Sequence, residues 1–209
     1  MREPISHQQA LSIAAIRELE AQGFAQGLPM MQRAGQSAAA FANEQIRPAS
    51  RVLCLVGPGN NGGDALVAAR ELQALGHEVT AVMPVASPQA SADAKQALAQ
   101  WLAASGRLVQ SLPENKPDLV VDGFFGIGLD RPLSEPWQTV VNAVNAWQVP
   151  IVALDIPTGL AADTAQTLGQ PIRARWTLAF LAPSLATGLA QGQRYCGQCW
   201  LEDLDLKSA

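Results

Sequence analysis

The sequence has 209 residues, of which 48% are hydrophobic and 15% charged, and its formal net charge is −4 at pH 7. This composition supports a large buried core and excludes a disordered chain. The net charge argues against the basic surface of a nucleic-acid-binding protein, and no stretch reaches the ~18 consecutive apolar residues of a membrane span. We therefore expect a cytoplasmic protein that binds neither nucleic acid nor membrane.

Two helices are expected before the first strand. Apolar residues recur at near-helical spacing over residues 8–22, and Gly23 interrupts that pattern. A second helix is predicted from about 29 to 46. We interpret residues 1–50 as a helical arm that packs on a single domain spanning 1–209.

Strand and helix patterns alternate through the rest of the chain. The almost wholly apolar run 51–56 is typical of a parallel strand buried on both faces. The other expected elements are strands at 79–83, 108–109, 118–122, 150–154, 176–181 and 199–201, and helices at 64–75, 87–105 and 137–147. This alternation predicts an α/β fold: a Rossmann-like three-layer α/β/α arrangement with a mostly parallel central sheet and N-terminal helices.

A glycine-rich segment, Gly-Pro-Gly-Asn-Asn-Gly-Gly-Asp at 57–64, lies between the first expected strand and the helix after it. Glycines allow a ligand to approach the backbone, and a helix N-terminus offers free N–H groups to a phosphate. Gly57, Gly59 and Gly62 also satisfy the spacing G-x-G-x-x-G. We expect this loop to hold the phosphate end of a dinucleotide, the alternative being a tight turn that merely requires glycine.

An ordinary dehydrogenase is disfavoured by the residues beyond this loop. The dinucleotide fingerprint places an acidic residue about 20 positions further on, at the end of the second strand. Here that strand runs into Met-Pro-Val-Ala-Ser at 83–87, which contains no carboxylate. A nicotinamide-dependent oxidoreductase therefore remains only a third hypothesis.

Two further loops come after predicted strands, and each begins with an aspartate, Asp122 or Asp155. The carboxyl ends of parallel strands open onto one crevice, where burial and mutual repulsion can shift carboxyl pKa values. Either aspartate could instead cap a helix or form a local turn. Two such residues beside the glycine-rich loop favour a functional site.

Three motifs together resemble those of the NAD(P)H-hydrate epimerases. They are NNGGD at 60–64, D-x-x-x-G-x-G-x-x-R-P at 122–132 and DIPTGL at 155–160. The resemblance covers nearly the whole chain and includes Glu-Leu-Glu at 18–20 and Met-Met-Gln-Arg-Ala-Gly at 30–35. In bacteria such a domain often precedes a dehydratase domain, so a fused or separate dehydratase is an expected partner. A homodimer is a further expectation.

The resemblance implies that the protein interconverts the R and S epimers of hydrated NADH and NADPH. It implies Asp155 as the catalytic residue and Asn61, Asp122 and Thr158 as ligands of a potassium ion. The implied substrate-binding residues are Asn60, Asn61, Gly62, Gly63, Asp64, Gly126, Ile127, Gly128, Leu129, Asp130, Arg131, Pro132 and Asp155.

Elementary chemistry agrees with this set of residues. A carboxyl group can protonate the departing hydroxyl and recover a proton from the incoming water, while the ring nitrogen stabilises the cation. The reaction therefore needs no redox cofactor. Amide, carboxylate and hydroxyl oxygens suit a hard cation. We expect Asn61, Asp122, Asp155 and Thr158 to converge on one crevice, and Asp122→Ala to remove potassium dependence while leaving the fold largely intact.

The sequence departs from the family pattern at two relevant positions. Thr158 stands where the family has serine, which keeps the hydroxyl, and Ser184 stands where a late motif has lysine. The second departure predicts altered electrostatics at that edge of the site. It also sustains an alternative function, a non-catalytic nucleotide-binding regulatory module with the same pocket.

Overall fold

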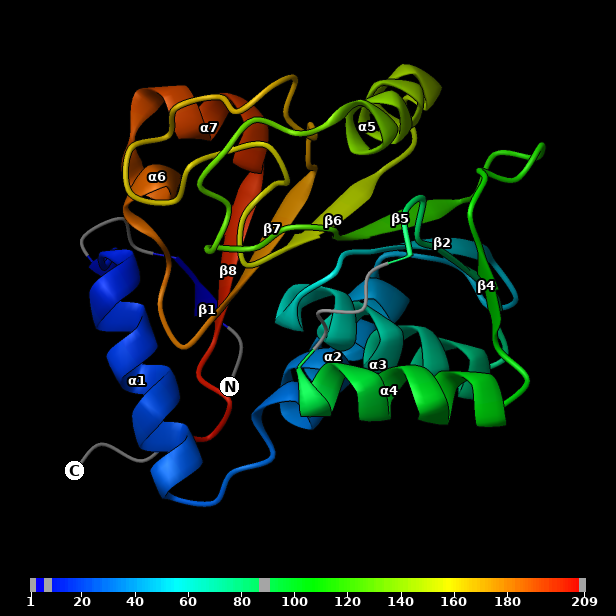
Figure 1. Ribbon diagram of the computed structural model, residues 1–209, viewed down its shortest axis with the longest axis horizontal. Helices are drawn as coiled ribbons and strands as arrows, with labels where there is room; N and C mark the ends of the chain where they lie inside the picture. The colour runs from blue at the N-terminus through cyan, green and yellow to red at the C-terminus, as the bar shows by residue number, and fades with distance from the viewer. Residues whose placement is uncertain (1–2, 6–8, 87–90, 207–209) are drawn as a thin grey trace.

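The computed structural model describes residues 3–5, 9–86 and 91–206, which form a sheet between two layers of helices (Figure 1). The strands are β1 (Glu3–Pro4), β2 (Arg51–Val56), β3 (Glu78–Val82), β4 (Arg107–Val109), β5 (Leu119–Gly123), β6 (Ile151–Leu154), β7 (Trp176–Phe180) and β8 (Gln198–Glu202). The helices are α1 (Ile13–Ala25), α2 (Met30–Glu44), α3 (Asn60–Ala74), α4 (Ala92–Ala103), α5 (Glu135–Trp147), α6 (Leu185–Gly188) and α7 (Ala190–Cys196). Within these described ranges, every helix is too short or too polar to cross a membrane.

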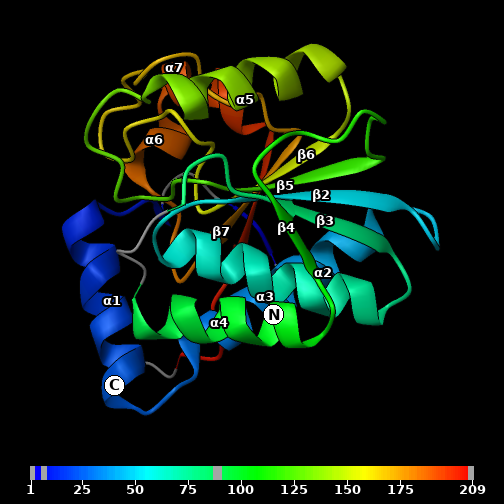
Figure 2. The same ribbon diagram turned by 45° about the vertical axis from the view of Figure 1, so that its right-hand side comes forward.

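The strand order is β1-β8-β7-β6-β5-β2-β3-β4. Every neighbouring pair from β4 to β8 is parallel, and only the short β1 pairs antiparallel, with β8. Helices α2, α3 and α4 cover one face, and α5, α6 and α7 lie on the other (Figures 1 and 2). The predicted three-layer, mostly parallel fold is confirmed.

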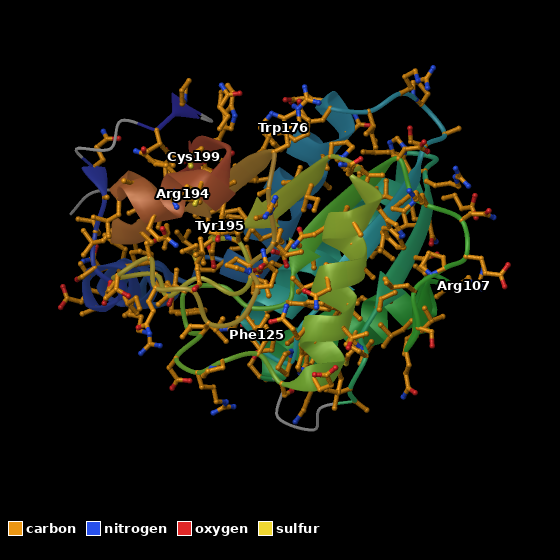
Figure 3. All side chains as sticks on the ribbon, turned by 90° about the horizontal axis from the view of Figure 1, so that it is seen from above. Arg107, Phe125, Trp176, Arg194, Tyr195 and Cys199 are labelled. Atoms are coloured by element: carbon orange, nitrogen blue, oxygen red, sulfur yellow. The ribbon has the colours of Figure 1, made fainter. Side chains whose placement is uncertain are left out.

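The connectivity creates a switch point between β2 and β5. The chain moves outward from β2 through β3 to β4 and then returns to place β5 on the other side of β2. In open α/β sheets, ligands bind in the crevice outside the carboxyl ends of the strands at such a point. Seen from above, Arg107 of β4 and Cys199 of β8 lie toward opposite sides of the molecule (Figure 3), and β2 and β5 lie between these two strands in the sheet.

Strand β2 explains why the apolar run 51–56 correctly predicted a strand buried on both faces. Val52, Cys54 and Val56 join the core under α2 and α3, whereas Leu53 and Leu55 join the core under α5. Successive side chains of a strand point to opposite faces, so a strand covered on both faces must be apolar throughout.

The two N-terminal helices differ in their relation to the sheet. Helix α2 packs closely on α3: a Cβ built on Gly35 would lie 2.3 Å from Cβ of Val67. Helix α2 is therefore part of the core layer, whereas α1 stands apart beside the carboxyl edge of the sheet (Figures 1 and 2). The N-terminus of α1 is fixed where the Ile13 N–H donates to Oδ1 of Asp163 at 2.8 Å.

Helix α3 begins four residues earlier than the sequence predicted, at Asn60 instead of 64. The glycines that suggested a loop are required by close packing of the first helical turn, because a Cβ at Gly62 would lie 2.0 Å from the Gly57 carbonyl oxygen. The predicted loop is thus only 57–59, and the asparagines belong to the helix.

Three short elements were not predicted: β1, α6 and α7. Residue 8 and residues 87–90 of the predicted helices lie outside the described residues.

Candidate active site

A cavity of about 300 Å³ opens at the carboxyl ends of β2, β5 and β6. Its walls are the β2–α3 turn, the first residues of α3, the loop after β5, helix α1 and the side chain of Asp155. The lining residues are Arg17, Glu20, Pro58, Gly59, Asn60, Asn61, Asp64, Phe124, Phe125, Gly126, Ile127, Gly128, Leu129 and Asp155. The position agrees with the topological switch point of the sheet.

Most of the residues predicted to bind substrate line this cavity: Asn60, Asn61, Asp64, Gly126, Ile127, Gly128, Leu129 and Asp155. Gly62 and Gly63 are buried behind the wall, in the first turn of α3. Asp130, Arg131 and Pro132 are exposed and lie beyond the lining residues. The family motif therefore extends further along the loop than the cavity does.

The N-terminus of α3 supplies hydrogen-bond donors to the cavity. The Gly63 N–H bonds to the carbonyl of Gly59 at 3.3 Å, so the preceding helical N–H groups have no carbonyl partner within the helix. Beside Gly59 the space is open, with no atom within 4 Å of a built Cβ. The 15-residue helix adds the positive end of its dipole. This corner of the cavity suits a phosphate group.

Asp155 comes directly after β6, and its side chain is partly exposed to the cavity. Its backbone has φ of 60°, a left-handed conformation that aspartate tolerates better than most residues. The Asp155 N–H donates to the carbonyl of Leu178 at 2.8 Å, which fixes the residue against β7. Burial and the nearby carboxylate of Glu20 raise the pKa of Asp155 to about 7, against the opposing effect of the Phe180 N–H.

Two further carboxyl groups share the cavity with Asp155. Asp64 is 8% exposed, and its pKa is raised well above the usual value by burial and by the carboxylates of Asp155 and Glu20. Burial also raises the pKa of Glu20, and the guanidinium of Arg17 opposes that rise. The cavity therefore raises the pKa values of all three carboxyl groups above their ordinary range, and at Glu20 a neighbouring guanidinium opposes the rise.

We predict that Asp155 makes the fold less stable as the pH rises. Its folded-state pKa of about 7 lies above the ordinary value of 3.8, so the native state binds the extra proton between these pH values. The free energy of unfolding should fall across that window and then level off. Asp155→Asn should reduce the fall by about 1–2 kcal/mol, since water in the cavity screens part of the effect. Urea unfolding of both proteins at pH 4.5, 6 and 8 measures this difference. The same dependence of the free energy of unfolding on pH in the variant and the parent protein would contradict the prediction.

Asp122 and Thr158 lie in direct contact beneath the cavity, and neither is exposed. Thr158 donates its N–H to Oδ2 of Asp122 at 2.8 Å and its hydroxyl to Oδ1 at 2.7 Å. Oδ1 also accepts the N–H of Phe124 at 3.3 Å. Burial raises the pKa of Asp122 to about 6, although these hydrogen bonds oppose the rise. Asp122 thus joins the loop after β5 to the turn after β6.

These contacts change one expectation from the sequence. Because Asp122 accepts three hydrogen bonds in a fully buried place, Asp122→Ala cannot leave the fold largely intact. Its effect on ion binding would therefore be mixed with an effect on folding.

Asn61 has an unusual environment at the cavity wall. The residue is 7% exposed, and both its Oδ1 and its Nδ2 are buried without a hydrogen-bond partner among the described residues. A buried amide without partners is costly, so these atoms are suited to contact a bound group. A Cβ built on Gly126 would lie 2.8 Å from Oδ2 of Asp155 and 3.2 Å from Cγ of Asn61, which places both side chains around the same point.

Gly126→Ala provides a test of this crowding. The added methyl group would press on Asp155 and Asn61, so we expect turnover to fall by roughly 10–100-fold, the scale of losses from misplaced site groups. Gly128→Ala, in the same loop, should have a smaller effect because its Cβ would meet only Nη2 of Arg17 at 3.9 Å. Steady-state kinetics and melting temperatures of both variants check the prediction, and equal turnover losses would contradict it.

Aromatic side chains support the loop after β5. The rings of Phe124 and Phe125 lie 4.8 Å and 5.0 Å from Trp137 of α5, both in edge-on arrangements. Phe125 is on the side of the sheet covered by α5 (Figure 3). The Phe125 N–H also donates to the Thr158 hydroxyl at 3.0 Å. The loop that lines the cavity is thus held by ring packing and by the Asp122–Thr158 pair.

The sequence did not predict two of the charged residues in the cavity. Arg17 and Glu20 come from α1, one helical turn apart, and reach the site because α1 crosses the open edge of the sheet. Glu20 belongs to the Glu-Leu-Glu stretch that the family resemblance included but gave no role. Ser184, which stands where the family motif has lysine, is 1% exposed and is not among the lining residues.

Fold and site together define a Rossmann-like protein with a cavity at its switch point, where the N-terminus of α3 and three carboxyl groups meet. Residues 27–186 match the family described as "YjeF-related protein N-terminus", and the chain belongs to that family. It is 48% identical over 198 residues to an NAD(P)H-hydrate epimerase of Achromobacter xylosoxidans (strain A8), which covers 93% of this chain and 92% of that protein.

Two other relatives extend this comparison. The chain is 42% identical over 165 residues to a "Bifunctional NAD(P)H-hydrate repair enzyme Nnr" of Gloeobacter violaceus, with 75% of this chain and 32% of that protein covered. It also resembles the crystal structure of the yeast protein ynu0, with a TM-score of 0.74, 25% identity, and coverage of 84% of this chain and 82% of that one. The resemblance predicted from the motifs is confirmed.

Proposed function

We propose that this protein is an isomerase that interconverts the R and S epimers of hydrated NADH and NADPH. The observation that carries the proposal is the cavity in which Asp155 faces the phosphate-binding end of α3. Relatives that match over more than nine tenths of the chain, at 48% and 44% identity, are named NAD(P)H-hydrate epimerases. If the cavity binds the dinucleotide, the proton NMR signals of hydrated NADPH should shift when the protein is added in excess.

The reaction needs a proton donor, access for a water molecule and an anchor for the phosphates. Asp155, with a pKa of about 7, can hold a proton near neutral pH and give it to the departing hydroxyl. The lone pair of the ring nitrogen then stabilises the cation, and water adds to the same carbon. The α3 N-terminus would bind the phosphates and hold the ring against Asp155.

The alternatives have less support. A non-catalytic module would need only the phosphate corner, whereas this cavity also contains carboxyl groups with raised pKa values, a property typical of acid–base sites. The absent lysine, which favoured that alternative, falls at a buried residue outside the lining. For an oxidoreductase, the acidic residue expected after the second strand is missing.

The proposal includes a potassium ion held by Asn61, Asp122 and Thr158. The unpartnered Oδ1 of Asn61 and the all-oxygen donor set fit a hard monovalent cation. Among the residues that the structure describes, no group of three His, Cys, Asp or Glu side chains could hold a metal ion. The proposed site differs from such a group because Asp122 is its only charged ligand. A bound cation would supply positive charge near the phosphates.

Potassium should stabilise the protein if this site exists. Binding to the native state alone adds about 1.4 kcal/mol at a free concentration ten times the dissociation constant. We expect the melting temperature to rise with potassium chloride at constant ionic strength, balanced with tetramethylammonium chloride. Asn61→Ala should abolish the rise, because it removes a ligand without breaking any hydrogen bond that the structure gives that side chain. A melting temperature insensitive to the cation would exclude the ion.

The proposal also extends to the partner proteins and the cellular location of this protein. We propose that a dehydratase, fused or separate, consumes one epimer, since the longer relatives are named bifunctional repair enzymes. The homodimer, the cytoplasmic location and the assignment of 1–209 to one domain stay predictions.

A further inference from the structure

Epimerisation by loss and return of water involves both faces of the nicotinamide-derived ring. The hydroxyl leaves from one face, and the new hydroxyl forms on the other. A carboxyl group held on one side of a bound ring reaches only that side. A fixed ring therefore needs a second proton-transfer group on the opposite wall of the cavity, and that group must be able to accept a proton from the incoming water.

Glu20 and Asp155 reach the cavity from different elements. Asp155 is carried by the sheet edge, at the end of β6, whereas Glu20 is carried by α1, which stands across that edge (Figures 1 and 2). Both side chains line the cavity of about 300 Å³ described above, and both also line a smaller cavity of about 60 Å³. The two carboxyl groups are near enough for the charge on Glu20 to raise the pKa of Asp155.

Asp64 is a less suitable second base, although it lines the same two cavities. It is carried by α3, and its exposed fraction is 8%. Burial and the carboxylates of Asp155 and Glu20 all favour its protonated form, which can donate a hydrogen bond but cannot accept a proton. Glu20 is more exposed than Asp64, and although burial raises the pKa of Glu20, the guanidinium of Arg17 one turn away opposes that rise, whereas among the described residues no cation opposes it at Asp64.

We propose that Glu20 is a second catalytic residue, which serves the ring face opposite Asp155 in the epimerisation proposed above. In one direction, protonated Asp155 gives its proton to the hydroxyl, and the C–O bond breaks to release water. The ring nitrogen's electron pair forms the C=N bond of the cation. Water attacks the other face, the C–O bond forms, and its proton passes to the Glu20 carboxylate. One proton has moved from Asp155 to Glu20, and exchange with cavity water restores the starting state.

Oxygen exchange separates the two halves of this mechanism. Pure R and S epimers of hydrated NADPH would be incubated in ¹⁸O-labelled water, and label and configuration followed by mass spectrometry after chromatographic separation. Glu20→Gln should slow epimerisation by about 10²–10⁴-fold. It should still exchange the hydroxyl oxygen of one epimer with retained configuration, since Asp155 can remove and restore water on its own face. Asp155→Asn should show the reverse, with exchange confined to the other epimer.

The matched control is Glu18→Gln, an identical change at an exposed position of the same helix, which should behave as the parent protein. Normal epimerisation by Glu20→Gln would overturn the proposal. Equal loss of oxygen exchange from both epimers in Glu20→Gln would also overturn it, because a merely structural role gives that result. A one-sided loss of exchange in Asp64→Asn, and not in Glu20→Gln, would overturn it as well. If the parent protein itself neither epimerises nor exchanges above the protein-free rate, the proposed function fails first.

Discussion

Asp155→Asn should lower the turnover of hydrated NADPH epimers by about 10²–10⁴-fold while affinity for the dinucleotide changes little. Asparagine keeps the shape of the side chain and tolerates the left-handed backbone, with φ of 60° at this position. It cannot release a proton to the hydroxyl. The loss should therefore appear in kcat, measured after the spontaneous epimerisation is subtracted, whereas the dissociation constant from fluorescence or calorimetry should remain similar.

A matched change at the other end of the molecule provides the control. Asp118 lies at the amino edge of β5, where it accepts the Arg51 N–H at 2.7 Å, and it is not among the cavity-lining residues. Asp118→Asn should keep near-normal turnover. Near-normal turnover in Asp155→Asn would instead remove Asp155 from the chemistry and leave the cavity as a binding site.

Asp122→Ala should lower the free energy of unfolding by about 3–5 kcal/mol, because each buried donor left without an acceptor costs about 1–3 kcal/mol. The donors affected are the N–H and hydroxyl of Thr158 and the N–H of Phe124. Their carboxylate is fully buried, so water can replace it only by entering the space that the substitution creates. Guanidinium unfolding with a free fit of the slope measures the change.

A double-mutant cycle identifies the interaction responsible. Thr158→Val removes the hydroxyl that donates to Asp122 at 2.7 Å, and Asp122→Asn weakens the same contact from the other side. We expect a coupling energy of about 1–3 kcal/mol between the two substitutions. A loss below about 1 kcal/mol in Asp122→Ala, or strictly additive effects in the cycle, would show that the pair does not hold the two loops together.

Most of the fold could be predicted because its strongest signals are local. Strand β2 was predicted with its observed bounds, since burial on both faces requires an unbroken apolar run. The short α6 and α7 were missed because they contain few residues and little periodicity. The start of α3 was placed too late because Gly62 and Gly63 discourage a helix locally, whereas the close approach of Gly57 requires a glycine at 62 and the packing of Met31 and Ala94 leaves little room for a side chain at 63.

The site was predictable only where sequence motifs lie at strand ends. Asp155 and the two loops come after parallel strands, so topology brings them together. The hydrogen bonds between Asp122 and Thr158 depend on the register of two turns, which the motifs do not encode. Glu20 reaches the cavity through the tertiary placement of α1, which stands outside the layers, and no periodicity within 13–25 indicates that placement.

Conversion of a single pure epimer tests the central proposal most directly. The S epimer of hydrated NADPH would be incubated with purified protein, and the R epimer followed by chromatography against a protein-free blank. We expect the approach to equilibrium to accelerate in proportion to protein concentration, with no change in the total of the two epimers. A time course that overlaps the blank would contradict the proposed epimerase function.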